Sequence, residues 1–234
     1  MDIRIFRIQY NTSLDMPLVN LLPDLTRVPV GTIYCIGRNY IKHIQELENE
    51  VNADPVLFLK PAASLITQGR EIELPAFSSD VHHETEVVLL VGREGRHIAE
   101  ADALHHIAGV GIGLDLTARD TQSALKAKGL PWTISKGFET AACVSDFHPT
   151  QEYADLSALH FTLYVNGEMR QEGDTSLMIF SVPRIVAFIS SIVTLHPGDL
   201  IYTGTPHGVA ALAPGDRLDL EMHGLTATFS VKGA

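Results

Sequence analysis

HETEVVLLV, residues 83–91, is the stretch of this sequence that determines the fold. In a β-strand, alternate side chains face opposite sides of the sheet, so Glu84 and Glu86 share one face with the apolar residues at positions 88 and 90. Both faces become apolar toward the end of the stretch, which is typical of a strand covered on both sides. The stretch therefore predicts a buried strand with two carboxylates near its beginning.

Most of the segments around this strand are also predicted to be strands. Strands are expected at 32–36, 56–59, 109–115, 159–165, 168–172, 199–202, 217–222 and 225–231, and helices at 40–50, 102–108, 117–128 and 183–195. Asn166-Gly167 separates two of the strands and is the strongest short signal for a tight hairpin. The sequence contains no internal repeat and no low-complexity tract. The predicted fold class is α+β, in a domain dominated by sheet with few short helices.

Composition excludes several classes of partner and environment. The 234 residues include 17 Lys+Arg and 28 Asp+Glu, giving a net charge of −11, which argues against nucleic acid as a partner. The longest apolar stretches, 87–91 and 185–195, are shorter than the roughly 20 residues of a membrane span. Two distant cysteines, Cys35 and Cys143, favour neither a zinc site nor a disulfide framework. We expect a soluble cytoplasmic protein without a secretory signal.

The two glutamates near the beginning of the strand suggest a metal site. Two buried like charges at this spacing repel each other, so one must take up a proton or a cation must compensate both. Hard divalent cations prefer oxygen ligands, which makes such a cation the simplest solution. The alternative is that Glu84 and Glu86 lie at an exposed strand entry and bind nothing.

A third acidic residue, Asp115, ends a glycine-rich apolar strand. Arg119 and Gln122 follow it and are three residues apart, on one face of a predicted helix. Asp115 and Arg119 alone would be a structural salt bridge. Together with Glu84 and Glu86 they indicate a metal beside a clamp for an anionic substrate.

The predicted helix 40–50 carries a possible acid–base pair. His43 and Glu46 are three residues apart, close enough for the carboxylate to hold the imidazole in one tautomer. A solvated acidic helix face is the alternative, because further glutamates follow at positions 48 and 50.

The sequence contains the motifs GRNYxxHxxE (37–46), PVLFLKP (55–61), HHExE (82–86), LDxTARDxQ (114–122), KGLPWT (128–133), NGExRQEG (166–173) and TGTPxGV (203–209). Together these motifs resemble the fumarylacetoacetate hydrolase family, in particular its small branch of acylpyruvate hydrolases and oxaloacetate decarboxylases. They occur in order from about residue 30 to the C-terminus. Thr85 and the residues after Glu86 depart from the pattern, because close relatives often have Leu between the acids and Gly after them. The departure leaves the metal ligands in place but weakens a subfamily assignment.

The resemblance implies a role for each matching residue. Glu84, Glu86 and Asp115 match metal ligands for Mg²⁺ or Mn²⁺, and His43 and Glu46 match a mobile catalytic dyad. Lys136 matches an active-site lysine, although a lone loop lysine is usually exposed. The matches to substrate contacts are Arg119, Gln122, Lys60, Gly204 and Thr205. The implied fold is a mixed β-sandwich roll, commonly dimeric, in a single catalytic domain of residues 29–234 preceded by an arm of residues 1–28.

The implied chemistry is metal-dependent cleavage of a C–C bond in a small 2-oxo acid. A divalent metal chelated by the carboxylate and the 2-oxo oxygen would stabilise the enolate that cleavage leaves. We expect acylpyruvate hydrolysis first and oxaloacetate decarboxylation second. The alternatives are an isomerase or decarboxylase of an unsaturated 2-oxo diacid and, in another class, a non-catalytic module that binds 2-oxo acids or metal.

Overall fold

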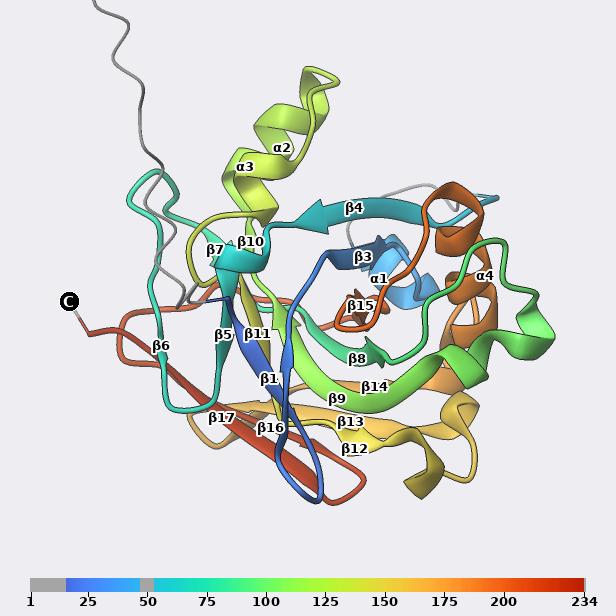
Figure 1. Ribbon diagram of the computed structural model, residues 1–234. Coiled ribbons are helices and arrows are strands. Elements are labelled where there is room, and N and C mark those ends of the chain that lie inside the picture. The colour runs from blue at the N-terminus through green and yellow to red at the C-terminus, as the bar shows by residue number, and fades with distance from the viewer. Residues whose placement is uncertain (1–15, 47–52, 234) are drawn as a thin grey trace, which may run out of the picture.

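The computed structural model describes residues 16–46 and 53–233, and two packed sheets form most of this part of the chain. The larger sheet has the strand order β4-β3-β15-β8-β9-β11-β5, with β12 paired to β9, and the smaller has the order β14-β13-β16-β17-β6. Figure 1 shows the smaller sheet lying across one side of the curled larger sheet. The parallel pairs β15·β3, β11·β5 and β17·β6 lie among antiparallel ones. The predicted α+β fold, a mixed-sheet roll, is confirmed.

The larger sheet contains β3 (Ile33–Gly37), β4 (Val56–Lys60), β5 (Leu65–Thr67), β8 (Thr85–Val91), β9 (Ile107–Asp115), β11 (Ala142–Val144), β12 (His148–Pro149) and β15 (Leu200–Tyr202). The smaller sheet contains β6 (Glu71–Ile72), β13 (His160–Val165), β14 (Glu168–Asp174), β16 (Arg217–Met222) and β17 (Leu225–Val231). Two short ribbons consist of β1 (Leu18–Leu21) with β2 (Thr26–Pro29) and β7 (Val81–His82) with β10 (Thr117–Ala118). The α-helices are α1 (Ile41–Glu46), α2 (Arg119–Ala127), α3 (Thr133–Lys136) and α4 (Val182–Ile192), and the short 3-10 helices cover Ala62–Ser64, Glu100–His106, Thr150–Glu152, Leu156–Ala158 and Thr175–Leu177.

Strand β8 is buried on both faces, as its sequence predicts. All seven of its residues are buried, and it pairs with β15 on one side and β9 on the other. Val87 and Leu89 belong to the main core, which also includes residues of the smaller sheet. Val88 and Leu90 pack on the opposite face in a second cluster with Val19 and other apolar side chains. Both faces of the larger sheet are therefore covered.

The hairpin between β13 and β14 follows from Asn166-Gly167. Asn166 has φ of 53° and Gly167 has φ of 81°, and a type I′ turn requires positive φ at both positions. This turn matches the twist of the strands on either side and sets their register next to the turn; the register shifts between Leu163 and Tyr164.

The helices lie at the ends of the sheets. Figure 1 shows α2 and α3 together at one end and α4 at another. Helix α1 ends at Glu46, and the remainder of the predicted helix 40–50 lies outside the described residues. Residues 100–106 form a 3-10 helix where an α-helix is predicted at 102–108. No helix within 16–46 and 53–233 has the length and apolar character needed to cross a membrane.

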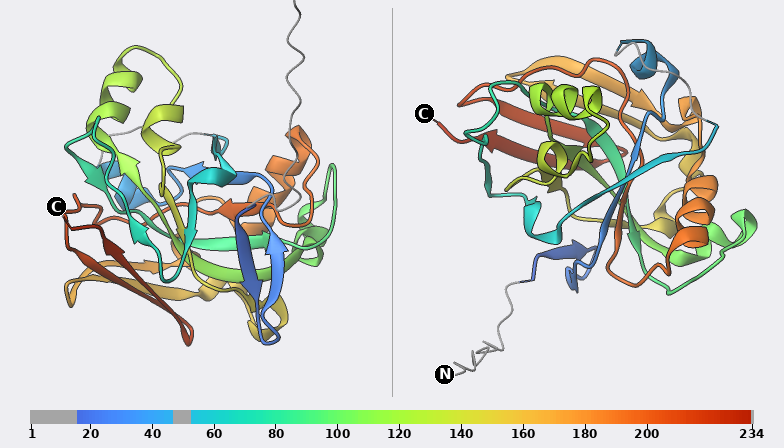
Figure 2. Two further views of the ribbon diagram at one scale, coloured as in Figure 1. Left: turned by 60° about the vertical axis from the view of Figure 1, so that its left-hand side comes forward. Right: turned by 90° about the horizontal axis from the view of Figure 1, so that it is seen from above.

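Part of the predicted N-terminal arm is a hairpin. Residues 16–28 include β1 and most of β2, which Figure 2 shows at the edge of the molecule, and residues 1–15 lie outside the described part. Asn20 accepts a hydrogen bond from the backbone N–H of Phe147, and Leu22 donates one to the Phe147 carbonyl. The hairpin is thus held against the larger sheet, and the division into an arm and a catalytic domain stays a prediction.

Candidate metal and catalytic site

Three buried carboxylates meet where β8 and β9 pair. Glu84 immediately precedes β8, Glu86 lies on it and Asp115 ends β9. The antiparallel register pairs Glu86 with Gly113, and the Asp115 N–H donates to the Glu84 carbonyl at 2.8 Å. One oxygen from each carboxylate lies within 4.8 Å of the other two. The exposed fractions are 4% for Glu84 and 1% for Glu86 and Asp115, so the three form one buried anionic cluster.

Buried cations compensate two of these carboxylates. Lys136 Nζ lies 2.7 Å from both Glu84 Oε2 and Asp115 Oδ2, and Arg119 forms an ion pair with the other oxygen of Glu84. Although burial opposes ionisation of Glu84, attraction to Lys136 and Arg119 outweighs it and lowers the pKa of Glu84. Burial likewise disfavours charged Lys136, but Asp115 and Glu84 raise the Lys136 pKa. Glu84 and Lys136 are therefore a buried ion pair.

Glu86 lacks this compensation. Burial raises its pKa well above the ordinary value, and repulsion from Asp115 and Glu84 raises it further. Its Oε2 accepts a hydrogen bond of 2.6 Å from the Gly204 N–H. A divalent cation beside Glu86 would offset the like charges that favour its protonation.

One oxygen of Asp115 is paired with a buried cation but accepts no hydrogen bond. Lys60 Nζ lies 2.7 Å from Asp115 Oδ1 but donates hydrogen bonds to the carbonyls of Leu116, Lys136 and Ala141. An ammonium has three N–H donors, so these carbonyls use all of them, and Asp115 Oδ1 is buried without a hydrogen bond. Three buried carboxylates, one of which has an oxygen without a hydrogen bond, fit Mg²⁺ or Mn²⁺, because these cations take oxygen ligands.

The predicted acid–base pair lies on α1. His43 Nδ1 is 3.3 Å from Glu46 Oε2, and Glu46 Oε1 accepts a hydrogen bond of 3.0 Å from the Gly208 N–H. Partial burial opposes ionisation of Glu46, but these bonds from His43 and Gly208 lower its pKa. Glu46 is therefore an ionised hydrogen-bond acceptor that can hold the imidazole in one orientation.

A cavity of about 30 Å³ joins the two groups. Of the predicted site residues, it is lined by His43, Glu84, Glu86, Arg119, Gln122, Lys136 and Thr205. Arg119 donates to Gln122 Oε1 at 2.7 Å, which confirms that the two share a helix face. Asp115 and Glu46 are not in the lining but contact the lining residues Lys136 and His43. The cavity thus contains carboxylates, cations and an imidazole close together.

Two predicted substrate contacts lie outside this lining. Lys60 is 1% exposed and reaches the site through Asp115 and the Lys136 carbonyl, while Gly204 contributes its backbone N–H to Glu86. As arranged here, both support the carboxylates, and contact with substrate stays a prediction for them.

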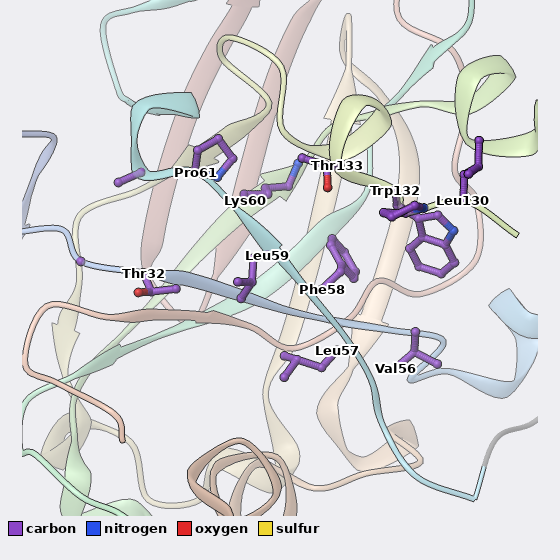
Figure 3. A pocket seen from close by; sticks show the side chains of 13 residues that line it. Thr32, Val56, Leu57, Phe58, Leu59, Lys60, Pro61, Leu130, Trp132 and Thr133 are labelled. Atoms are coloured by element: carbon purple, nitrogen blue, oxygen red, sulfur yellow. The ribbon is translucent and has the colours of Figure 1, made fainter. Parts of the chain in front are cut away.

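The sequence reasoning missed six residues of the lining, namely Ile36, Gly37, Arg38, Phe58, Lys126 and Trp132. Arg38, Phe58 and Trp132 all lie within quoted motifs, which was the available signal, while nothing in the sequence singles out Lys126. Phe58 and Trp132 pack edge to face with ring centroids 5.7 Å apart. Figure 3 shows this pair in the wall of a larger apolar groove of about 760 Å³ beside β4. The two rings therefore separate that groove from the charged cavity.

Comparison with known proteins agrees with the observed fold and with the family that the motifs suggest. Residues 32–231 match the family model described as fumarylacetoacetate (FAA) hydrolase C-terminal. The chain is 46% identical over 195 residues to the protein named oxaloacetate tautomerase FAHD1, mitochondrial, of Rattus norvegicus, covering 83% of this chain and 88% of the relative. It is 45% identical over 194 residues to the mitochondrial oxaloacetate decarboxylase of Dictyostelium discoideum, covering 82% and 89%.

A solved structure also resembles the whole fold. The fumarylpyruvate hydrolase of Pseudomonas aeruginosa, in complex with Mn²⁺ and pyruvate, superposes with a TM-score of 0.89 at 32% identity. The match covers 94% of this chain and 97% of that one.

The comparisons correct the predicted location. The curated relatives from Rattus norvegicus, Mus musculus and Dictyostelium discoideum are named as mitochondrial proteins, so the prediction of a cytoplasmic protein is wrong. The expected family is confirmed, since its model matches most of the chain and the relatives are enzymes that act on small 2-oxo acids. The chain belongs to the fumarylacetoacetate hydrolase family.

Proposed function

We propose that the protein is a divalent-metal-dependent enzyme that forms the enol or enolate of a small 2-oxo acid, with tautomerisation of oxaloacetate as its main reaction. The observation that carries this proposal is the meeting of Glu84, Glu86 and Asp115 with the His43–Glu46 pair around one cavity. Sequence reasoning favours acylpyruvate hydrolysis, but relatives that are 42–46% identical are named oxaloacetate tautomerases. Tautomerisation therefore takes first place.

Glu84, Glu86 and Asp115 would hold Mg²⁺ or Mn²⁺. A cation bound there would supply chelation of the 2-oxo acid and stabilisation of negative charge that develops on its 2-oxo oxygen. Arg119, at the beginning of α2, can offer its planar guanidinium to the substrate carboxylate, and Gln122 keeps that guanidinium in place through a hydrogen bond of 2.7 Å. Together these groups orient C3 of the substrate inside the cavity.

His43 is the proposed base. Its neutral imidazole removes a proton from C3, the C3–H electron pair moves into a C2–C3 double bond, and the imidazolium returns that proton to the 2-oxo oxygen to give the enol. Glu46 accepts the hydrogen bond from Nδ1, which leaves Nε2 as the basic nitrogen. Lys136, which is ion-paired with Glu84 and Asp115, would stabilise negative charge that develops on the substrate. This reaction requires no attacking water.

A second candidate is cleavage of the C3–C4 bond, favoured by the fold it shares with a fumarylpyruvate hydrolase and by the same dyad. For an acylpyruvate, His43 would activate a water that adds to the C4 carbonyl. The C3–C4 bond then breaks, giving a carboxylic acid and the pyruvate enolate. For oxaloacetate, C4 would depart as CO₂ without water. Both routes use the same stabilisation of charge on the 2-oxo oxygen.

Two assays on one preparation test the proposal. With Mg²⁺, the protein should accelerate the approach of oxaloacetate to keto–enol equilibrium, followed by ultraviolet absorbance of the enol. Release of pyruvate from oxaloacetate and from acetylpyruvate, followed by a coupled dehydrogenase, measures cleavage. We expect His43→Ala to lower the tautomerisation rate by about 10²–10⁴-fold, as for a lost general base. A Mg²⁺-loaded protein that accelerates neither reaction would overturn the proposal.

A further inference from the structure

Strand β4 contacts both ends of the short helix α3, whose last residue is Lys136. Phe58 on β4 packs edge to face on Trp132, the N-cap residue of α3, and its ring centroid lies 4.9 Å from Lys136 Nζ (Figure 3 shows the two rings together). Alternate residues of a strand share a face, so Lys60 lies on the same side of β4 as Phe58. Lys60 Nζ donates to the backbone carbonyls of Lys136 and Ala141. One face of β4 therefore holds both the backbone and the side chain of Lys136.

The ammonium of Lys136 is restricted from several sides. Lys136 is 2% exposed, and its Nζ donates hydrogen bonds of 2.7 Å to Glu84 Oε2 and Asp115 Oδ2. The Phe58 ring covers a further side, because Nζ lies over its face within the roughly 6 Å that is typical of a cation–π contact. This attraction is stronger in a buried place than at an exposed one. Two carboxylates and one aromatic face thus determine where the positive charge lies.

The third N–H of Lys136 is available to a ligand. An ammonium has three donors, and within residues 16–46 and 53–233 the acceptors for this one are the two carboxylate oxygens. Lys136 also lines the small cavity, together with His43 and Glu86. An acceptor for the remaining donor can therefore be supplied by a molecule inside that cavity.

We propose that Phe58 is a positioning residue for the proposed reaction, and that its ring holds the Lys136 ammonium where the third N–H meets negative charge developing on the substrate. The inference rests on the proposed function, in which charge develops on the 2-oxo oxygen as the C3 proton leaves. A donor that is fixed in advance stabilises this charge without reorganisation during the reaction. Phe58 acts through Lys136 in this role, so its effect falls on kcat more than on KM.

Stepwise fluorination of the Phe58 ring tests this role at nearly constant shape. Fluorine withdraws electrons from the ring face, so mono-, di- and trifluorinated phenylalanine at this position should attract a cation progressively less. At saturating Mg²⁺, we expect kcat for oxaloacetate tautomerisation to fall with each fluorine, by about tenfold in all, while KM changes by less than about twofold. The affinity for oxalate, a planar dianion that resembles the enolate, should fall in the same order in calorimetric titration.

Two further variants separate the contact with Lys136 from aromatic packing. Trifluorinated phenylalanine at Phe77, which packs edge to face with Phe138 and does not line the cavity, is the matched control and should leave kcat unchanged. Trp132→Leu removes the other aromatic partner of Phe58 that is described here, and the dependence on fluorine number should persist in that variant. Circular dichroism of each protein checks that the fold is retained.

The outcomes distinguish this inference from the proposed function. The role of Phe58 would be overturned by a kcat that does not depend on the number of fluorines, by a loss confined to KM, by an equal loss for fluorinated Phe77, or by a dependence that disappears in Trp132→Leu. If the wild-type protein with Mg²⁺ accelerates neither tautomerisation nor cleavage, the proposed function itself fails, and the inference fails with it.

Discussion

At the scale of single residues, the site is a balance between buried carboxylates and buried cations. Lys136 and Arg119 compensate the charge of Glu84. Burial and the acidic neighbours of Glu86 raise its pKa, which favours its protonated form. A group of this kind gains most from a divalent cation, because the cation removes the repulsion and supplies a partner. The same three residues would therefore determine both metal affinity and activity.

Removing any one carboxylate charge should abolish tight metal binding. We expect Glu84→Gln, Glu86→Gln and Asp115→Asn each to weaken Mg²⁺ binding by at least roughly 10–100-fold. This is the typical loss when a residue that only orients a metal ligand is removed, and removal of a ligand should cost no less. Calorimetric titration of Mg²⁺ measures the affinity, with Glu221→Gln on the exposed surface of β16 as the control. Unchanged affinity in all three variants would show that the cation binds elsewhere.

The pKa of Glu46 reports on the dyad. Its ordinary value is 4.5, and hydrogen bonds from His43 and Gly208 lower it in the folded protein despite partial burial. Because the folded pKa is below the unfolded one, ionised Glu46 adds to stability above the unfolded pKa, and this contribution is lost as pH falls through the folded value. In His43→Asn the pKa should move upward. Carboxyl ¹³C NMR titration of Glu46 measures both midpoints, and identical midpoints would mean that His43 does not act on Glu46.

Some of these residues could be predicted from the sequence and others could not. The strand period of two places Glu84 and Glu86 on one face of a buried strand, so their proximity is local information. The surroundings of Lys60 are not local, because its ammonium contacts carbonyls at 116, 136 and 141. Only the folded chain brings those carbonyls together, and the prediction of a substrate contact could not take them into account.

At the scale of elements, Gln171 links the two sheets to the site. It lies on β14 and is 1% exposed. Its Oε1 accepts from the Thr85 N–H and lies 2.9 Å from His83 Nδ1, and its Nε2 donates to Thr205 Oγ1 and to the Pro206 carbonyl. One side chain thus fixes the strand that carries Glu86 relative to the loop that contains Thr205, which lines the cavity.

Gln171→Glu should therefore disturb the site without contacting substrate. A carboxylate keeps the shape but cannot donate to Thr205 or Pro206, which leaves a buried carbonyl unpaired at a cost of about 1–3 kcal/mol in unfolding free energy. We expect kcat/KM to fall together with stability, measured by kinetics and by urea unfolding. Gln151→Glu, at an exposed position in a 3-10 helix, is the control. Full activity and stability in Gln171→Glu would exclude a positioning role.

Strands with a long alternating sequence pattern could be predicted, whereas short strands that pair with distant parts of the chain could not. The alternating residues of β16 and β17 and the hairpin turn at Asn166 define strands by themselves. The two-residue strand β7 exists because it pairs with distant parts of the chain, namely β10 and residues near Ala211. The ribbon of β1 and β2 escaped prediction in the same way, since prolines such as Pro29 argue locally against regular structure.

At the scale of the whole molecule, the composition says less about possible ligands than the geometry of the cavity does. A net charge of −11 argues against nucleic acid as a partner, yet beside its carboxylates the cavity gathers Arg38, Arg119, Lys126 and Lys136. Cations gathered in a small cavity of an acidic protein can attract a small anion without attracting polyanions. The composition also led to a wrong prediction of cellular location, because two cysteines without a disulfide are compatible with more than one reducing compartment. The homodimer implied by the resemblance stays a prediction.

Metal binding should be visible in the stability of the entire chain. A ligand that binds only the folded state at 100 times its Kd stabilises that state by about 2.7 kcal/mol. For a protein of 150–250 residues, each 1 kcal/mol raises Tm by about 2–4 °C, so Mg²⁺ should raise Tm by about 5–10 °C. The gain is expected because the three buried carboxylates repel one another and β8 and β9, which carry Glu86 and Asp115, pair in the centre of the larger sheet. Differential scanning calorimetry with increasing Mg²⁺ measures the shift, and Asp115→Asn should lose most of it. A shift of equal size in that variant would place the stabilising cation outside the three-carboxylate cluster, since its binding would then not depend on the charge that β9 contributes.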